Sequence, residues 1–325
     1  MNRSKNSQPH SKRQILNRLM NNSEVTVTLF IVIAAVIVGI SSGIFFTRTN
    51  LVNISKQVAV NGIISMGMML AIIAKGVDLS VGSTLALVCV IAGSLIQRNV
   101  PVALVLVSCL ATGAVCGFIN GILIVKLNVM PIIVTLGIMN IYRGIAYVYS
   151  GGKWTTNLPS AYIAFGNGLI PASILILIVI IFSVVMKHTC FGRHVYAMGS
   201  NEESARLAGI NVDEMKVKIF TIVGLLTGVA AIVFIGRVGA IQPSAGDGYE
   251  MDAIGAAVLG GVSFSGGKGT PVGTLLGAVL MGLIMNAMTL MKIGANWQGF
   301  ATGVIIIMAL LLDTVRTVYR SRRAE

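Results

Sequence analysis

The chain has 325 residues, of which 55% are hydrophobic and 11% are charged. A soluble domain carries about 25% charged residues, which water solvates at its surface, so this composition excludes an ordinary water-soluble protein. The net charge of +13 also raises the question of nucleic-acid binding. The basic residues instead flank membrane-length apolar runs, so we expect contact with membrane lipid and no nucleic-acid partner.

The first apolar run, at 25–46, contains no charged residue. At about 1.5 Å rise per residue, a helix of this length crosses a hydrocarbon core of about 30 Å. Further membrane segments are predicted at 51–74, 79–97, 101–125, 131–149, 168–186, 216–236, 251–265, 270–291 and 296–313. The predicted fold class is therefore all-α, a polytopic transmembrane helical bundle of about ten membrane segments.

The segment at 251–265 is short and rich in glycine. Interrupted helical backbone is tolerated in a membrane where it is buried in protein or lines a wet cavity. We therefore expect a broken or half helix at this place, close to a pathway through the protein.

Three basic stretches border the apolar runs: a tail at 1–24, a loop at 187–215 and a second tail at 316–325. Basic residues favour the cytoplasmic side of a membrane. Both tails and the loop are therefore predicted to be cytoplasmic, with an even number of crossings between them. The first tail is polar and is expected to be disordered, and residues 25–315 form the predicted transmembrane domain.

Glycines recur four residues apart within two of the predicted segments. Small residues at this spacing let helix backbones approach closely in a membrane. Close packing is the expected role and a mobile hinge is the alternative for Gly113, Gly117, Gly121, Gly273 and Gly277.

A short pattern, G-V-x-[L/F]-S-x-G, occurs at 76–82 and again at 261–267. Each copy is followed by a proline or small-residue step and an apolar span that contains an asparagine, Asn120 or Asn286. Interrupted segments in corresponding places of two halves indicate a pathway built from repeats. The pattern therefore predicts two weakly related halves.

The basic loop contains one predicted helix, at 200–209. Ser200 and Glu203 have the spacing of a capping box. Glu202 suits the positive end of the helix dipole, and Gly209 suits a helix stop. A helix of about two turns is marginal alone in water, so it needs a surface to bind. We expect a protein groove, with the membrane interface as the alternative.

Three ordered motifs resemble one family. Residues 199–210 (GSNEESARLAGI) resemble the cytoplasmic coupling loop of permeases in bacterial ABC importers. Together with 76–83 (GVDLSVGS) and with 242–254 (QPSAGDGYEMDAI), which leads into 260–267 (GGVSFSGG), this loop resembles the ribose/xylose/galactose branch of that superfamily. The resemblance covers residues 25–315.

The resemblance implies a permease subunit of the bacterial inner membrane that forms the passage for a monosaccharide. It implies two copies of an ABC ATPase subunit on the cytoplasmic loops, a periplasmic sugar-binding protein, and a second permease chain that is identical or a paralogue. Branched-chain amino acid permeases and stand-alone secondary transporters are the alternatives. The residues expected to bind the ATPase are Asn201, Glu202, Glu203, Ala205, Arg206, Leu207 and Gly209.

Polar residues near the predicted breaks are candidates for the pathway. Asp78 either lines it or caps a helix that begins at Leu79. The acidic loop at 247–252 is predicted to lie outside, where it either binds hydroxyl groups or a delivering protein, or forms a solvated turn. The full set of candidates is Asp78, Ser80, Ser83, Asn120, Glu250, Asp252, Ser263 and Asn286.

Catalytic, metal and cofactor sites are not expected. No nucleophile–base arrangement stands out, and the stretch 266–270 (GGKGT) fails the P-loop pattern, which requires Ser or Thr directly after the lysine. The chain is therefore expected to be no enzyme, with ATP hydrolysed by a partner subunit. The cysteines lack metal-binding spacing and are expected to be small core residues: Cys89, Cys109, Cys116 and Cys190.

Overall fold

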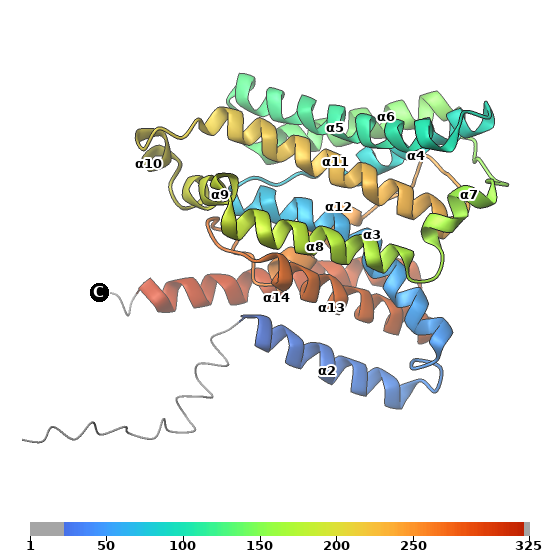
Figure 1. Ribbon diagram of the computed structural model, residues 1–325. Coiled ribbons are helices and arrows are strands. Elements are labelled where there is room, and N and C mark those ends of the chain that lie inside the picture. The colour runs from blue at the N-terminus through green and yellow to red at the C-terminus, as the bar shows by residue number, and fades with distance from the viewer. Residues whose placement is uncertain (1–22, 322–325) are drawn as a thin grey trace, which may run out of the picture.

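The computed structural model describes residues 23–321, which are largely helical (Figure 1). The predictions for 1–22 and 322–325 lie outside the described residues. The elements are α2 (Ser23–Ser41), α3 (Arg48–Ile73), α4 (Val81–Gln97), α5 (Val102–Leu127), α6 (Pro131–Ser150), α7 (Ser160–Ile163), the 3₁₀ helix η1 (Ala164–Gly166), α8 (Ile170–His188), α9 (Cys190–Ser200), α10 (Glu202–Leu207), α11 (Val212–Val238), α12 (Tyr249–Leu259), α13 (Pro271–Leu290) and α14 (Ala295–Ser321).

Within the described residues, seven helices are long and apolar enough to cross a membrane: α2, α3, α5, α6, α8, α11 and α13. Helix α4 and the apolar part of α14, Trp297–Leu311, are shorter. Helix α12 has 11 residues and is a half helix. These helices correspond in order to the predicted segments and confirm the all-α, polytopic class.

Two predicted segment ends are wrong. Helix α2 ends at Ser41, and a turn closed by the Phe45 N to Ser42 O hydrogen bond separates it from α3, so the first run is not one helix through 46. Helix α12 ends at Leu259, because Gly261 takes a left-handed φ of 90° that stops the helix before 265. At the other end of the chain, α14 continues to Ser321, past the expected start of the second tail at 316.

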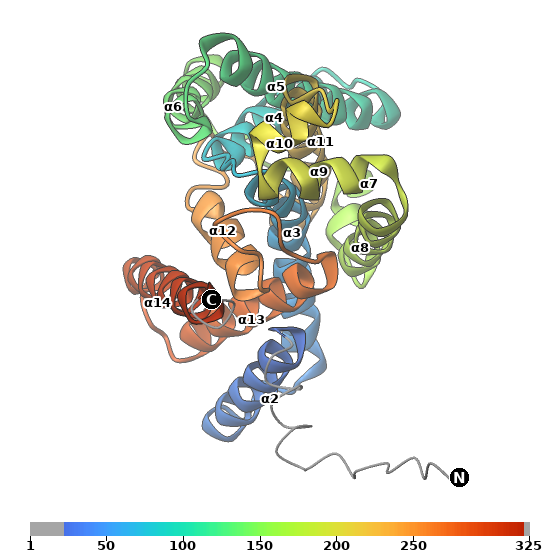
Figure 2. The same cartoon turned by 90° about the vertical axis from the view of Figure 1, so that its left-hand side faces the viewer.

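Helix α3 is the centre of the bundle. Its most apolar window is 89% buried inside the protein, whereas that of α2 is 6% buried. It packs against α8, α11, α12 and α13, and the end-on view in Figure 2 shows it between α4, α5 and α11 on one side and α12 and α13 on the other. The outer helices α2, α5, α6 and α8 expose many large apolar side chains, as lipid contact requires.

Helices α5 and α11 form a glycine seam, the strip where Gly113 and Gly117 of α5 lie against Gly224 and Gly228 of α11, and where Gly121 lies against Val217. A Cβ atom added to Gly117 would overlap the carbonyl oxygen of Phe220, and one added to Gly113 would overlap that of Gly224. The prediction of close backbone packing is therefore confirmed for α5. It holds also for Gly273 and Gly277 of α13, which lie against the backbone of Gly260 and Ala256.

One end of the bundle carries a helical elbow, formed by α9 and α10 at residues 190–207. Figure 1 shows that the beginning of α2 and the end of α14 lie at this same end, which we call the elbow end. This arrangement agrees with an even number of crossings between α2 and the elbow, and again between the elbow and the end of α14. The short helix α7 lies at the opposite end.

Candidate functional site

The segment between α3 and α4 is an extended break held by Asp78. This side chain is 2% exposed. Its carboxylate accepts hydrogen bonds from the Ser80 backbone N–H at 2.9 Å, from the Ser80 hydroxyl at 2.6 Å and from the Asn120 amide at 3.1 Å.

The prediction that Asp78 caps a helix beginning at Leu79 was wrong. Helix α4 begins at Val81, and Ser80 stands at its N-cap position without a side-chain cap. Asp78 instead bonds the backbone two residues on, the local pattern that Asp adopts in turns. The carboxylate therefore shapes the break and not the helix end.

The break is pinned to two further helices. Asn120 of α5 also donates to the Ser80 hydroxyl at 2.8 Å, and the Thr135 hydroxyl of α6 donates to the Val77 carbonyl at 3.1 Å. Ser83 donates to the Ser80 carbonyl at 2.9 Å. Four candidates, Asp78, Ser80, Ser83 and Asn120, are thus brought together in one buried polar cluster, which we call the Asp78 cluster.

The beginnings of the two short helices α4 and α12 meet inside the bundle. A Cβ added to Gly82 would overlap both the carbonyl oxygen of Gly246 and the carboxylate of Glu250. The loop before α12 is fastened by Arg143 of α6, which donates to the Pro243 carbonyl at 3.0 Å and to the Ala245 carbonyl at 2.7 Å. Glu250 therefore lies beside the first turn of α4, where the positive end of the helix dipole favours an anion.

Asp252 joins three helices. It accepts hydrogen bonds from Asn61 of α3 and Thr302 of α14, each at 3.3 Å. Asn61 is 5% exposed, and among the described residues its Oδ1 atom has no hydrogen-bond partner. The sequence analysis missed Asn61 and Thr302. An asparagine within the apolar run 51–74 was the available signal for Asn61, as it was for Asn120 and Asn286.

Asn286 of α13 pairs with Asn50 of α3, which the sequence analysis also missed. Each amide donates to the other's oxygen, at 3.1 Å and 2.9 Å, and both side chains are buried. This reciprocal pair satisfies two amides at once and ties the start of α3 to α13. This pair holds α3 and α13 together and is not part of the Asp78 cluster.

We expect a double-mutant cycle to expose this pairing. Asn50→Leu leaves the Asn286 amide without its partner, and Asn286→Leu leaves the Asn50 Oδ1 without its donor while Asn50 Nδ2 still donates to the Phe45 carbonyl; each change costs about 1–3 kcal/mol. The double variant Asn50→Leu/Asn286→Leu leaves neither amide, so its loss of stability should be smaller than the sum of the two single losses. Thermal unfolding in detergent measures this, and strictly additive losses would contradict the pairing.

Ser263 lies in the loop 260–270 between α12 and α13. The side chain is 7% exposed, and its backbone N–H donates to the Lys268 carbonyl at 3.0 Å. This loop reaches the break before α4, because Gly267 N–H donates to the Ile73 carbonyl at 2.8 Å. The two copies of the repeated pattern, at 76–82 and 261–267, therefore belong to neighbouring segments at the elbow end.

The loop helix is shorter than predicted and is capped differently. Helix α9 runs through Ser200, so the predicted capping box of Ser200 and Glu203 was wrong. Asn201 caps α10 by accepting the Ser204 N–H at 2.8 Å. Gly209 has a φ of 84° and follows the helix end, as predicted, with Ile210 N–H bonded to the Ala205 carbonyl.

One face of α10 is fixed to α11 and the other is open. Glu202 binds Lys216 at 2.7 Å, and Arg206 forms ion pairs with Asp213 and Glu202. Ala205 is buried, whereas Leu207 is 86% exposed and Glu203 is exposed. The predicted coupling residues of α10 therefore form two groups. Glu202 and Arg206 bind α11 and Ala205 is buried, whereas Glu203 and Leu207 are exposed.

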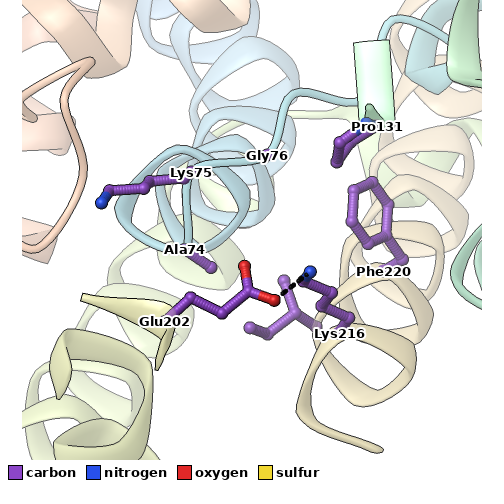
Figure 3. A pocket seen from close by; sticks show the side chains of 8 residues that line it. Ala74, Lys75, Gly76, Pro131, Glu202, Lys216 and Phe220 are labelled. Atoms are coloured by element: carbon purple, nitrogen blue, oxygen red, sulfur yellow. Dashed lines mark hydrogen bonds and ion pairs between the residues drawn. The ribbon is translucent and has the colours of Figure 1, made fainter. Parts of the chain in front are cut away.

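A cavity of about 80 Å³ lies beneath the start of α10. Figure 3 shows Glu202 and Lys216 pointing toward one another beside it, with Ala74 close to them and Phe220 and Pro131 at its side. Its lining comes from the break after α3, the starts of α6 and α10, and α11. The lining residues are Ala74, Lys75, Gly76, Pro131, Glu202, Lys216, Ile219 and Phe220.

Metal binding finds no support in the described residues, where no three His, Cys, Asp or Glu side chains gather in a way that would hold an ion. Cys89, Cys109 and Cys116 are buried, as expected of core residues, whereas Cys190 is exposed. The pathway candidates do not form one site: Glu250, Asp252, Ser263 and Asn286 each make contacts apart from the Asp78 cluster.

The extended break before α4, the half helix α12 and the elbow together define a class: helical membrane transport proteins with interrupted segments. Residues 50–310 match the family described as branched-chain amino acid transport system / permease component, and the chain belongs to this family. No solved structure matches the chain.

Relatives within this class are named for sugar import. The chain is 38% identical to the ribose import permease protein RbsC of Escherichia coli K12 over 296 residues, which are 88% of this chain and 92% of that protein. It is 38% identical to RbsC of Bacillus subtilis 168, over 94% and 97% of the two chains. It is 33% identical to the fructose import permease protein FrcC of Rhizobium meliloti, over 92% and 88%. The resemblance drawn from the three motifs is confirmed.

Proposed function

We propose that this chain is the membrane permease subunit of an ATP-binding-cassette importer that carries a monosaccharide. The proposed coupling to an ATPase rests on helix α10, which lies at the elbow end and whose Leu207 is 86% exposed. A helix of six residues is not stable alone in water. The ion pairs of Glu202 and Arg206 hold it against α11 and leave Glu203 and Leu207 free to meet a partner.

A protein partner suits α10 better than lipid. The helix carries Glu202, Glu203 and Arg206 within two turns, and charged groups of both signs match a protein groove. The proposed partner is the ATPase subunit, in two copies, one on each of two permease chains. The elbow end is then cytoplasmic, in a bacterial inner membrane.

A sugar is the proposed cargo because relatives 38% identical to this chain are named for ribose import and another, 33% identical, is named for fructose import. The family description names branched-chain amino acids, which is the alternative cargo. Glu250 and Asp252, with the amide of Asn61 and the hydroxyl of Thr302, offer donors and acceptors that suit a hydroxyl-rich cargo. We propose Glu250 and Asp252 as pathway residues.

The end opposite the elbow is the proposed docking place for a periplasmic binding protein. Asp247, in the loop between α11 and α12, is 83% exposed, so its carboxylate is available to a partner, while Arg143 is engaged in holding that loop. Transport follows when closure of the ATPase pair pulls on α10, tilts the helices behind it and opens the passage to alternate sides.

Co-purification in mild detergent tests the coupling. We expect the wild-type chain, expressed with its genomic neighbours, to retain an ATPase subunit. Leu207→Asp should weaken that binding by about 2 kcal/mol, or roughly 30-fold, because it removes an interface anchor. Glu203→Lys should weaken it as well, since it reverses a presented charge.

Two matched variants serve as controls. Leu207→Met keeps the apolar volume, and Lys153→Glu reverses an exposed charge away from the elbow, so both should retain the ATPase. Retention by Leu207→Asp at the wild-type level would contradict docking on α10. A wild-type chain that retains no ATPase would contradict the importer proposal as a whole.

A further inference from the structure

The elbow touches both interrupted segments of the bundle. Lys75, in the break before α4, donates from Nζ to the Ser200 carbonyl at the end of α9, at 3.2 Å. Tyr196 of α9 donates from its hydroxyl to the Gly269 carbonyl in the loop 260–270, at 2.8 Å. The loop is also bonded to the last residue of α3, directly before the break, because Gly267 N–H donates to the Ile73 carbonyl. We call this three-way contact the junction.

The junction is made of backbone lying directly on backbone. A Cβ added to Gly199 would overlap the Ile73 carbonyl oxygen and lie 2.7 Å from the Gly267 nitrogen. Gly266 and Gly267 have φ values of 83° and 70°, which glycine adopts without strain. No side chain lies between these backbones that could absorb a movement of one against another. A displacement of α9 therefore moves the break and the loop together.

A gap lies beside this tight contact. The cavity of about 80 Å³ borders Lys75 and Gly76 of the break and also Glu202 of α10 (Figure 3). Protein interiors are otherwise close-packed. Lys75 also has a φ of 60°, a conformation that a non-glycine residue adopts where surrounding contacts enforce it. The break is thus bonded to the end of α9 through Lys75 and borders a cavity beside that bond.

The same break continues into the Asp78 cluster. Three residues after Lys75, Asp78 binds Ser80 and Asn120, and Val77 binds Thr135. A movement of Lys75 and Gly76 therefore acts on a segment that is bonded to α5 and α6 and that leads directly into α4. The loop 260–270 leads into α13 in the same way.

We propose that Gly199 and Lys75 are positioning residues of the transport cycle: they join the elbow to both interrupted segments, so that one pull on α10 shifts the start of α4 and the start of α13 together. This inference rests on the proposed function, because the pull comes from the partner ATPase. Beyond that function, it names Gly199 and Lys75 as the residues through which a movement of α10 reaches both the break before α4 and the loop 260–270.

The test uses the complete transporter in proteoliposomes, with its ATPase and binding protein, and D-ribose and D-fructose in parallel as probes. Gly199→Ala separates the junction, and Lys75→Met removes its side-chain bond. Both variants should retain the ATPase and hydrolyse ATP, while sugar taken up per ATP hydrolysed should fall roughly tenfold. Lys75→Arg keeps a donor at this place and should recover most of the ratio.

Gly144→Ala is the control for Gly199→Ala, because Gly144 is a helical glycine of α6 with no heavy atom within 4 Å of an added Cβ. Its ratio of uptake to hydrolysis should equal that of the wild type. Equal ratios for Gly199→Ala, Lys75→Met and the wild type, with the ATPase retained, would overturn this inference and leave the proposed function standing. Loss of the ATPase from the wild type would overturn both.

Discussion

Replacing Gly117 by leucine should abolish the folded state of this chain in detergent. The added side chain would overlap the Phe220 carbonyl oxygen in the glycine seam, and a helix backbone has no flexible end that could move aside. Helices α5 and α11 would have to separate along their contact, which costs on the order of 3 kcal/mol or more. Thermal unfolding and the monodisperse fraction on size exclusion measure the effect.

Gly137→Leu makes the same change in a different setting. Gly137 is exposed on α6, and no heavy atom lies within 4 Å of an added Cβ. Leucine also has the higher helix propensity, so this variant should unfold at or above the wild-type temperature. If Gly117→Leu and Gly137→Leu unfolded at the same temperature, the seam would not be the close contact described.

The second large effect is expected from Asp78→Ala. Its carboxylate is the acceptor for the Ser80 N–H, the Ser80 hydroxyl and the Asn120 amide. All three donors are buried, and each donor left without an acceptor costs about 1–3 kcal/mol. We expect a loss of about 3 kcal/mol in unfolding free energy, together with loss of transport, since the break before α4 would no longer be pinned to α5.

The control for Asp78→Ala is Asp247→Ala, because the Asp247 side chain is 83% exposed. Surface substitutions of this kind change stability by about 0.5 kcal/mol or less. Asp78→Asn keeps one oxygen acceptor, so it should fall between the two. Asp78→Ala and Asp247→Ala with equal unfolding temperatures would contradict the pinning role of Asp78.

The membrane segments were predictable because lipid leaves a chain few choices. A span must be long and apolar, and closely packed helices in lipid favour small residues, so the order of the helices and the Gly117 contact follow from spacing alone. The half helix near 251–265 followed from its length and its glycines. The six-residue helix α10 was found because Glu202 and Gly209 carry strong local signals.

Helix starts and polar partners were less accessible from the sequence. Ser200 and Asn201 are both good capping residues, and the choice between them depends on where α9 ends, which its packing decides. Asn120 lies 42 residues from Asp78, and Asn286 lies 236 residues from Asn50. Such pairings follow from how helices cross in space, which residue spacing within one helix does not reveal.

The glycine seam has a consequence for how the chain changes shape. Helix α5 belongs to the first predicted half and α11 to the second, and their backbones touch over several turns. Separating α5 from α11 would lose the close van der Waals packing of these backbones, which is what holds helices together in a membrane. Helices α5 and α11 are therefore expected to move as one rigid unit, so in the proposed importer access would alternate by movement of this unit as a whole and not by separation of its two helices.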